Sequence, residues 1–255
     1  MLEALDLSLE LSKADYKQQL PLLQRRLHLL QRACWEQELA TLIVLEGWDA
    51  SGKGAVISKI TQQLEPRGFR IHAIREPRTF ESLLPWMWRF WAKLPNWGEM
   101  AIFDHSWYSR VLAERVGDRI SQLRWNRSYR DIMAFEQGLV ADRYLLAKFF
   151  LHIGQDEQTR RLKELESDSR TSWRVEPDDW AQNERYDDYR VAVEEMLERT
   201  ETEWGPWTLV AATDLRWTRV RILQTIIDVI EEGMERHGLD VPDPEAAYDD
   251  SEEDD

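Results

Sequence analysis

A glycine-rich segment beginning at Gly47 carries the residues best suited to chemistry. The apolar run Thr41 to Glu46 leads directly into Gly47-Trp-Asp-Ala-Ser-Gly-Lys53, which has the spacing G-x-x-x-x-G-K. In this pattern the backbone N–H groups from Gly47 to Gly52 turn toward a bound anion, and a helix that begins near Lys53 directs the positive end of its dipole at the same point. Glycine is common enough that the spacing alone is weak evidence, but a strand before it and a helix after it strengthen it. The segment therefore predicts a phosphate-binding loop and phosphoryl transfer.

One position of the loop departs from the usual motif. Gly54 follows the lysine where a Ser or Thr hydroxyl commonly holds magnesium, so a metal needs other oxygen ligands. Asp49 within the loop is one source, and Asp104 at the end of the apolar run Met100 to Phe103 is a second, because parallel strands deliver such residues to one edge of a sheet. We expect these two acids to hold Mg²⁺. The alternative is that Asp49 is a turn residue and Asp104 a helix cap.

Short β-rich runs alternate with segments of helical spacing along the chain. The pattern predicts a three-layer α/β/α sandwich with a five-stranded parallel sheet, in which the strands are covered on both faces. The expected strands are Thr41–Glu46, Phe69–Ile74, Glu99–Phe103, Leu145–Ile153 and Trp207–Ala212. The expected helices are Lys13–Glu36, Gly54–Leu64, Phe80–Trp91, Tyr108–Val116, Tyr129–Ala141, Asp156–Leu165, Glu184–Arg199 and Arg216–Glu235.

The pattern of alternation is interrupted between Leu165 and Trp180 by a polar stretch that contains Arg170 and Arg174. A polar insertion beside an active-site edge is typical of a lid, whose arginines would close over phosphate and exclude water. An ordinary surface loop is the alternative interpretation.

Composition sets the broad class of the protein. The chain has 255 residues, of which 43% are hydrophobic and 32% charged, and a single large domain is expected. We expect no membrane segment, and the first residues lack the pattern of a signal peptide, which favours a cytoplasmic protein. The only cysteine, Cys34, lies on a helical pattern and is expected to be a core or boundary residue rather than a nucleophile.

Charge is distributed unevenly along the sequence. The net charge is −15, and the segment Asp240 to Asp255 holds nine acids and no base, so the rest of the chain carries −15 + 9 = −6. We expect residues 239–255 to form a disordered acidic tail. Basic residues outnumber acids six to three both in Thr61 to Lys93 and in Ala101 to Arg130, which favours a polyanion near the loop. Pairing with acids three or four residues away is the alternative for each arginine.

Eleven spaced motifs, in order from about residue 40 to 230, resemble the polyphosphate kinase 2 family. The resemblance implies a thymidylate-kinase-like P-loop fold with a helical lid, and transfer of the terminal phosphoryl group of inorganic polyphosphate to a nucleoside mono- or diphosphate with Mg²⁺. The motifs begin at residues Glu46, Leu64, Trp88, Leu94, Phe103, Glu114, Lys148, Glu157, Trp173, Asp179 and Gly205, with the loop motif running to Gly54 and the Phe103 motif to Arg110.

The resemblance also implies roles for individual residues. Lys53 would cradle phosphate together with Gly47, Gly52 and Gly54, while Asp49 and Asp104 would organise the metal and the transferred group. The family's arginines near the phosphoryl group and the polyphosphate path correspond to Arg110, Arg115 and Arg67, and the lid to residues 162–182, with Arg170 as a phosphate contact. Three positions depart from the family pattern. His105 replaces an arginine that would be a bidentate phosphate donor, Ala55 replaces a glycine, and Thr171 replaces a basic residue.

The lid region resembles the N-terminal half of two-domain polyphosphate:AMP phosphotransferases, which looks degenerate at its active site, whereas the loop resembles the active half. An active kinase with AMP favoured over ADP is therefore expected, and a catalytically degenerate scaffold or regulatory subunit is the alternative. A homo-oligomer, dimer or tetramer, is expected, without nucleic-acid or membrane partners. The expected domain divisions are a helical extension over 1–38, the kinase domain over 39–238 and the tail over 239–255.

Overall fold

A parallel five-stranded sheet forms the centre of the computed structural model, which describes residues 1–244. The strands are β1 (Thr41–Gly47), β2 (Phe69–Ala73), β3 (Met100–Asp104), β4 (Leu145–His152) and β5 (Trp207–Ala211), in the order β2-β3-β1-β4-β5. Every neighbouring pair is parallel, so all strands end at one edge of the sheet, and Leu45 of β1 is in register with Asp104 of β3. The predicted five-stranded parallel sheet is confirmed.

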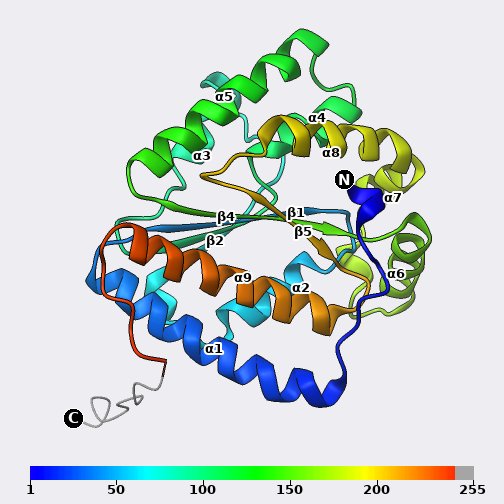
Figure 1. The fold of residues 1–255 in the computed structure, drawn as a ribbon. Coiled ribbons are helices and arrows are strands. Elements are labelled where there is room, and N and C mark those ends of the chain that lie inside the picture. Colours follow the sequence, from blue (N-terminus) through cyan, green and yellow to red (C-terminus); the bar gives the residue numbers. More distant parts are fainter. Residues whose placement is uncertain (245–255) are drawn as a thin grey trace.

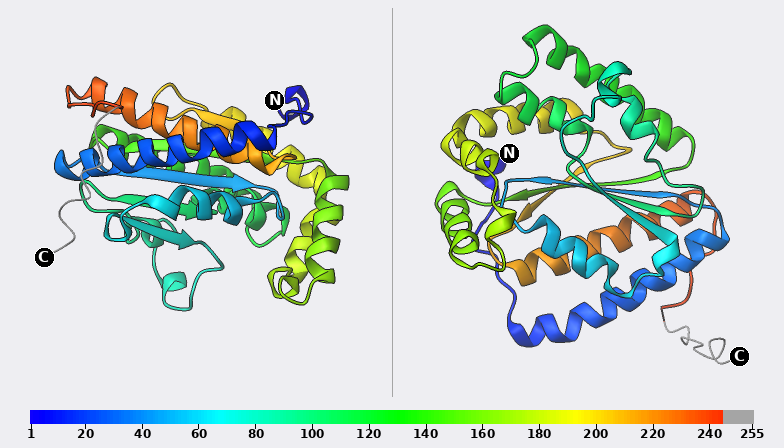
Figure 2. Two further views of the ribbon diagram at one scale, coloured as in Figure 1. Left: turned by 90° about the horizontal axis from the view of Figure 1, so that it is seen from below. Right: turned by 180° about the vertical axis from the view of Figure 1, so that it is seen from behind.

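Helices cover both faces of this sheet, as Figures 1 and 2 show. On one face lie α1 (Lys13–Glu36), α2 (Lys53–Ile60) and α9 (Leu215–Arg236); on the other lie α3 (Trp88–Trp91), α4 (Ala113–Val116), α5 (Gln122–Ala141) and α8 (Tyr186–Thr200). Two more helices, α6 (Gln155–Ser167) and α7 (Pro177–Glu184), stand beyond the carboxyl edge. Single 3₁₀ turns are η1 (Leu2–Ala4), η2 (Thr61–Gln63), η3 (Pro66–Gly68), η4 (Glu81–Leu83), η5 (Trp107–Arg110) and η6 (Ser172–Arg174). The expected three-layer α/β/α arrangement is therefore present.

Strand position explains where the apolar runs are strongest. Every residue of β1 and β4 is buried, because both are inner strands covered on two faces. The edge strand β2 differs: none of its residues is fully buried, and Ile71 is 46% exposed. The expectation that all five strands are covered on both faces is wrong for β2.

The N-terminal helix α1 is integral to one layer. Ser12 caps it by accepting the N–H of Asp15, and the helix continues through Pro21 to Glu36 without a break. It packs along α9, and Leu27, Leu30 and Cys34 are fully buried. The predicted extension over residues 1–38 thus contributes to the core beside the sheet, and burial raises the pKa of the Cys34 thiol to about 12.

Two of the expected helices are broken. In place of one helix over Phe80–Trp91 the chain forms η4 and the short α3, because Pro85 between them has no N–H to donate and disfavours helical geometry in the residue before it. In place of Tyr108–Val116 it forms η5 and α4, with Leu112 outside helical geometry. The helix α7 was not among the expected helices, although Pro177 in its first turn and the capping box between Glu176 and Asp179 are typical of a helix start.

A fully buried ion pair joins the sheet to the layer above it. Lys148 of β4 donates to Glu136 of α5 at 3.0 Å, and neither side chain is exposed. The hydroxyl of Tyr108 and the indole N–H of Trp107 both donate to Glu136, at 2.6 and 2.8 Å. These bonds fix η5, the turn that follows β3, against β4 and α5.

The chain remains ordered past the end of α9. Gln37 exchanges two hydrogen bonds with the backbone of Asp240, and Arg26 donates to the carbonyl of Pro242. Leu239 and Val241 pack against the core. The first residues of the predicted tail are thus docked beside the amino end of β1, and residues 245–255 lie outside the described residues. Within residues 1–244, no helix is long and apolar enough to span a bilayer.

Candidate active site

The loop between β1 and α2 has the backbone that its glycines predict. Gly47 and Gly52 have φ values of 145° and 103°, and an added Cβ at Gly47 would lie 2.5 Å from the carbonyl oxygen of Leu151. Gly52 is the N-cap of α2, which begins at Lys53. The N-terminus of α2 therefore faces the cavity in front of the loop, as in a phosphate-binding loop.

Aromatic packing supports the base of the loop. The Trp48 ring is buried and stacks on Tyr186 of α8 at a centroid distance of 4.0 Å. Its indole N–H donates to Nδ1 of His152 at 2.8 Å. His152 is buried, and this burial lowers its pKa to about 4, so the ring is neutral and accepts the bond at pH 7.

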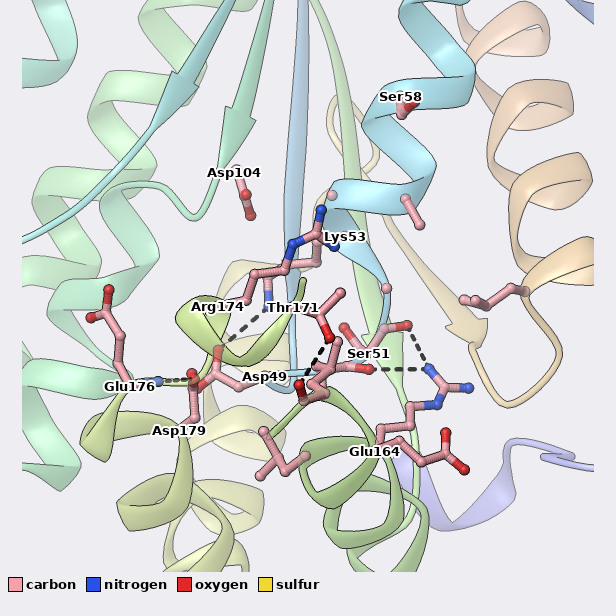
Figure 3. Close-up of a pocket in the computed structure, with 18 of the residues that line it drawn as sticks. Asp49, Ser51, Lys53, Ser58, Asp104, Glu164, Thr171, Arg174, Glu176 and Asp179 are labelled. Carbon is pink, nitrogen blue, oxygen red and sulfur yellow. Dashed lines mark hydrogen bonds and ion pairs between the residues drawn. The ribbon is translucent and has the colours of Figure 1, made fainter. Parts of the chain in front are cut away.

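Lys53 lies beneath the loop. Its Nζ donates to the carbonyl oxygens of Gly47 and Trp48, at 3.0 Å each, and lies 3.7 Å from Oδ1 of Asp49. Only 7% of the residue is exposed, so its charge acts in a largely dry environment. The lysine thus closes the loop and places a positive charge beside Asp49 (Figure 3).

His105 stands between two acids. Its Nδ1 lies 3.2 Å from Oε2 of Glu46, and its Nε2 lies 3.7 Å from Oδ1 of Asp49. Burial and the nearby Lys53 favour the neutral ring, but the contacts with Asp49 and Glu46 outweigh them and raise the pKa of His105 to about 9. Burial likewise opposes the charge of Asp49, yet His105 and Lys53 hold its pKa below the usual value. A cation therefore stands at position 105 at neutral pH, although not an arginine.

Asp104 ends β3 and faces the same cavity as Asp49 (Figure 3). Its Oδ1 is buried and has no hydrogen-bond partner within residues 1–244, which is the condition expected of a carboxylate oxygen that holds a cation. No cluster of three or more His, Cys, Asp or Glu residues in that part of the chain is arranged to hold a metal ion. The two acids fit Mg²⁺ well, because this ion usually keeps several waters and takes one or two carboxylates plus phosphate oxygens.

The cavity in front of the loop has a volume of about 1070 Å³. Asp49, Gly52, Lys53, Gly54 and Asp104 all line it. So do four basic residues that have no carboxylate partner within the described chain, namely Lys59, Arg75, Arg174 and Arg219. Unpaired cations around one cavity favour a polyanionic ligand.

Four arginines assigned from the resemblance lie elsewhere, and none of them lines this cavity. Each has a carboxylate partner: Arg67 pairs with Glu65, Arg110 with Glu114, Arg115 with Glu195, and Arg170 with Asp168. Arg110 and Arg115 also lie over the rings of Trp86 and Trp125. The structure thus groups the loop with the two acids and leaves these arginines in ion pairs.

Several residues that line the cavity were not predicted from the sequence. Arg75 comes just after β2, at the carboxyl edge of the sheet where Asp104 was expected. The rule that parallel strands deliver their last residues to one edge would therefore also have predicted Arg75. Asp179 of α7 is a further carboxylate of the cavity, and burial together with the charge of Asp49 raises its pKa to about 6. Lys59 and Arg219 had no such signal, because both lie within helices.

A family model described as polyphosphate kinase 2 matches residues 10–238. The chain belongs to the polyphosphate kinase 2 family. Two curated relatives carry the name polyphosphate:AMP phosphotransferase. The one from Pseudomonas syringae pv. tomato is 41% identical to this chain over 236 residues, and the one from Pseudomonas aeruginosa is 40% identical over 231 residues. These matches cover 92% and 91% of the chain. A GDP-polyphosphate phosphotransferase from Mycolicibacterium smegmatis is 35% identical over 84% of the chain and 76% of its own length.

Solved structures of the family share the fold. A polyphosphate kinase 2 from Arthrobacter aurescens TC1 superposes with a TM-score of 0.87 at 28% identity, covering 95% of this chain and 88% of that one. A Pseudomonas aeruginosa PA01 structure gives a TM-score of 0.89 at 39% identity over 92% of this chain and 50% of that one. The chain spans about half the length of the two Pseudomonas relatives, at 47% of each.

Proposed function

We propose that this chain transfers the terminal phosphoryl group of inorganic polyphosphate to a nucleoside mono- or diphosphate, with AMP as the favoured acceptor. The observation that carries the proposal is one cavity that holds Asp49, Lys53 and Asp104 together with cations that lack carboxylate partners. The names of the two Pseudomonas relatives support AMP, whereas the Mycolicibacterium relative is named for GDP.

The reaction needs little acid–base chemistry. A phosphate oxygen of the acceptor attacks the terminal phosphorus of polyphosphate, and the bond from that phosphorus to the bridging oxygen breaks. The shortened polyphosphate leaves with the electron pair of that bond. Since the attacking oxygen is already deprotonated at neutral pH, the protein has mainly to align the two phosphates and to stabilise charge.

The site residues divide these tasks between them. The N-terminus of α2 and Lys53 present positive charge to the transferred group, and Lys59, Arg75, Arg174 and Arg219 would bind the rest of the anionic substrates. Asp49 and Asp104 would hold Mg²⁺, which when bound would neutralise phosphate oxygens. Such chemistry on nucleotides is consistent with the expected cytoplasmic location, and a homo-oligomer remains part of the proposal.

A nucleotide assay with long-chain polyphosphate, magnesium, and AMP, ADP or GDP in parallel tests the function. We expect turnover with AMP highest, and Lys53→Ala to lower it by about 10² to 10³, because one preorganised charge is lost from the transition state. Asp49→Asn and Asp104→Asn should each raise the magnesium concentration that gives half-maximal rate. A wild-type protein that binds polyphosphate but phosphorylates no nucleotide would establish the scaffold alternative instead.

A further inference from the structure

The turn that carries Asp49 needs support from outside the loop. Ala50 has φ of 58°, in the left-handed region that is sterically unfavourable for a residue with a Cβ. Within the turn, one backbone bond runs from the N–H of Ser51 to the carbonyl of Trp48 at 3.1 Å. The other backbone groups of residues 49–51 that are bonded have partners in α6 and α7.

Three side chains of these helices hold the turn. Gln182 of α7 accepts the N–H of Asp49 at 2.8 Å, and Gln158 of α6 donates to the carbonyl of Asp49 at 3.2 Å. Arg161 of α6 donates to the carbonyls of Ala50 and Ser51, at 3.1 Å each. The two peptide groups that flank the Cα of Asp49 are therefore each bound by a glutamine.

The two glutamines also bind each other in a single orientation. Gln158 is fully buried, and its amide nitrogen donates to Oε1 of Gln182 at 2.8 Å as well as to Asp49. Asn183 donates to Oε1 of Gln158 at 3.0 Å. A flipped Gln158 amide would bring its oxygen against two acceptor oxygens, so the network admits one arrangement.

These contacts lie at the base of the lid. Gln158 is in the first turns of α6, and Gln182 is in the last turn of α7. The residues between the helices, 168–176, include the cavity residue Arg174, and within residues 1–244 their hydrogen bonds stay inside the lid. The lid is thus fastened to the loop at both ends, while its tip is not.

We propose that Gln158 and Gln182 are positioning residues, which fix the Asp49 carboxylate through its two peptide groups and couple that carboxylate to the base of the lid. The proposal rests on the role of Asp49 in the proposed function. A small rotation of either peptide group displaces the carboxylate, and groups that orient metal-binding residues in this way commonly change metal affinity or activity 10- to 100-fold when removed. A role limited to filling the core would change stability alone.

The test compares Gln158→Met and Gln182→Met with Gln155→Met as a matched control. Gln155 lies on α6 with Gln158, but it donates to the carbonyl of Asn183, a bond between α6 and α7 that does not involve the loop. Hydrogen–deuterium exchange of the peptide over residues 45–54, without substrate, reads the order of the loop. We expect about 10-fold faster exchange at the Asp49 amide in the two test variants, and about a 10-fold higher magnesium requirement for AMP phosphorylation. The control should match wild type in both.

Gln182→Glu distinguishes the loss of the hydrogen bonds from the loss of packing. Its carboxylate can still accept from the N–H of Asp49 and from the amide of Gln158, so exchange at the Asp49 amide should stay near that of wild type. The proposal is overturned if the folded methionine variants keep wild-type exchange or magnesium requirement, or if Gln182→Glu exchanges as fast as Gln182→Met. If the wild type turns over no substrate, the proposed function fails separately. Loop exchange and Mn²⁺ binding measured by electron paramagnetic resonance then decide the positioning role.

Discussion

Gly54 occupies the second position of α2, where a Cβ would meet no atom of residues 1–244 within 4 Å, apart from its chain neighbours and the backbone of the helix itself. Because the side chain would extend into the cavity, we expect Gly54→Ser to fold normally and to gain about 0.5 kcal/mol of stability from better helix propensity. The Michaelis constant for polyphosphate should nevertheless rise several-fold, since the added atoms take space that lets phosphate approach the backbone. Thermal melting and steady-state kinetics measure the two effects.

Gly52→Ser is the control for this prediction. Its Cβ would lie 2.5 Å from Cδ2 of Leu215, and φ is 103°, so this variant should lose stability. A Gly54→Ser protein that is both stable and fully active with wild-type affinity would show that phosphate does not approach this part of the loop.

Among single residues, the sequence predicted the positions of the loop and its two acids better than those of the arginines. Asp49 and Lys53 belong to a local motif, and Asp104 ends a strand, so short-range rules were enough to bring them to one cavity. The position of Arg115 was harder to predict, because its partner Glu195 is 80 positions away and no local pattern reveals such a pair. Arg110 and Glu114, in contrast, are four residues apart, which is the pairing that the sequence left open.

Among the elements, β4 carries the least expected feature, a charged side chain at the centre of an apolar run. Lys148→Met should destabilise the fold by about 3–5 kcal/mol, because Glu136 would be left buried without its cation. Urea denaturation measures the loss. The double variant Lys148→Met/Glu136→Gln should recover much of it, since the amide oxygen can still accept from Trp107 and Tyr108. Equal stability of the single and double variants would contradict this account.

His152, at the end of β4, makes stability depend on pH. Its pKa is about 4 in the folded protein and about 6.5 when unfolded, so the neutral ring stabilises the fold above pH 6.5, and this contribution is lost as pH falls toward 4. Between pH 7 and pH 5 the loss amounts to roughly 2 kcal/mol. We expect His152→Asn, whose oxygen can accept from Trp48, to lack this loss.

The free energy of unfolding of both proteins at pH 7 and pH 5 decides the point. Parallel changes in wild type and variant would mean that another group titrates.

Strands such as β4 were predictable because most of their residues are apolar, whereas the ion pair inside β4 depended on where α5 packs. The prediction of one helix over residues 80–91 was wrong, because it rested on apolar periodicity and did not take account of Pro85, which interrupts the helix.

At the scale of the whole molecule, residues 239–242 dock on the fold beside the amino end of β1. Two truncated variants distinguish the effect of this docking on stability from the effect of the acidic charge. Ending the chain after residue 244 removes seven acids and should leave the melting temperature nearly unchanged, because the removed residues are mostly charged or polar and hold little apolar surface to bury. Ending it after residue 238 also removes the contacts of Leu239, Asp240 and Val241 and should lower the melting temperature by several degrees. Equal melting temperatures for both truncations would show that these contacts contribute nothing.

Docking of Asp240 beside Gln37 also places negative charge on the side of the sheet opposite the cavity. The described acids of this segment, Asp240 and Asp243, follow from the amino edge of the sheet, while the cavity with its unpaired cations opens at the carboxyl edge (Figures 1 and 3). Such a separation of charge is a permanent dipole, which turns a protein in the field of an approaching polyanion so that one face leads. Polyphosphate would then meet the cavity first and be repelled from the rear. Because charges farther apart than about 8 Å are screened at physiological salt, this orienting torque belongs to dilute solution and fades as salt is added.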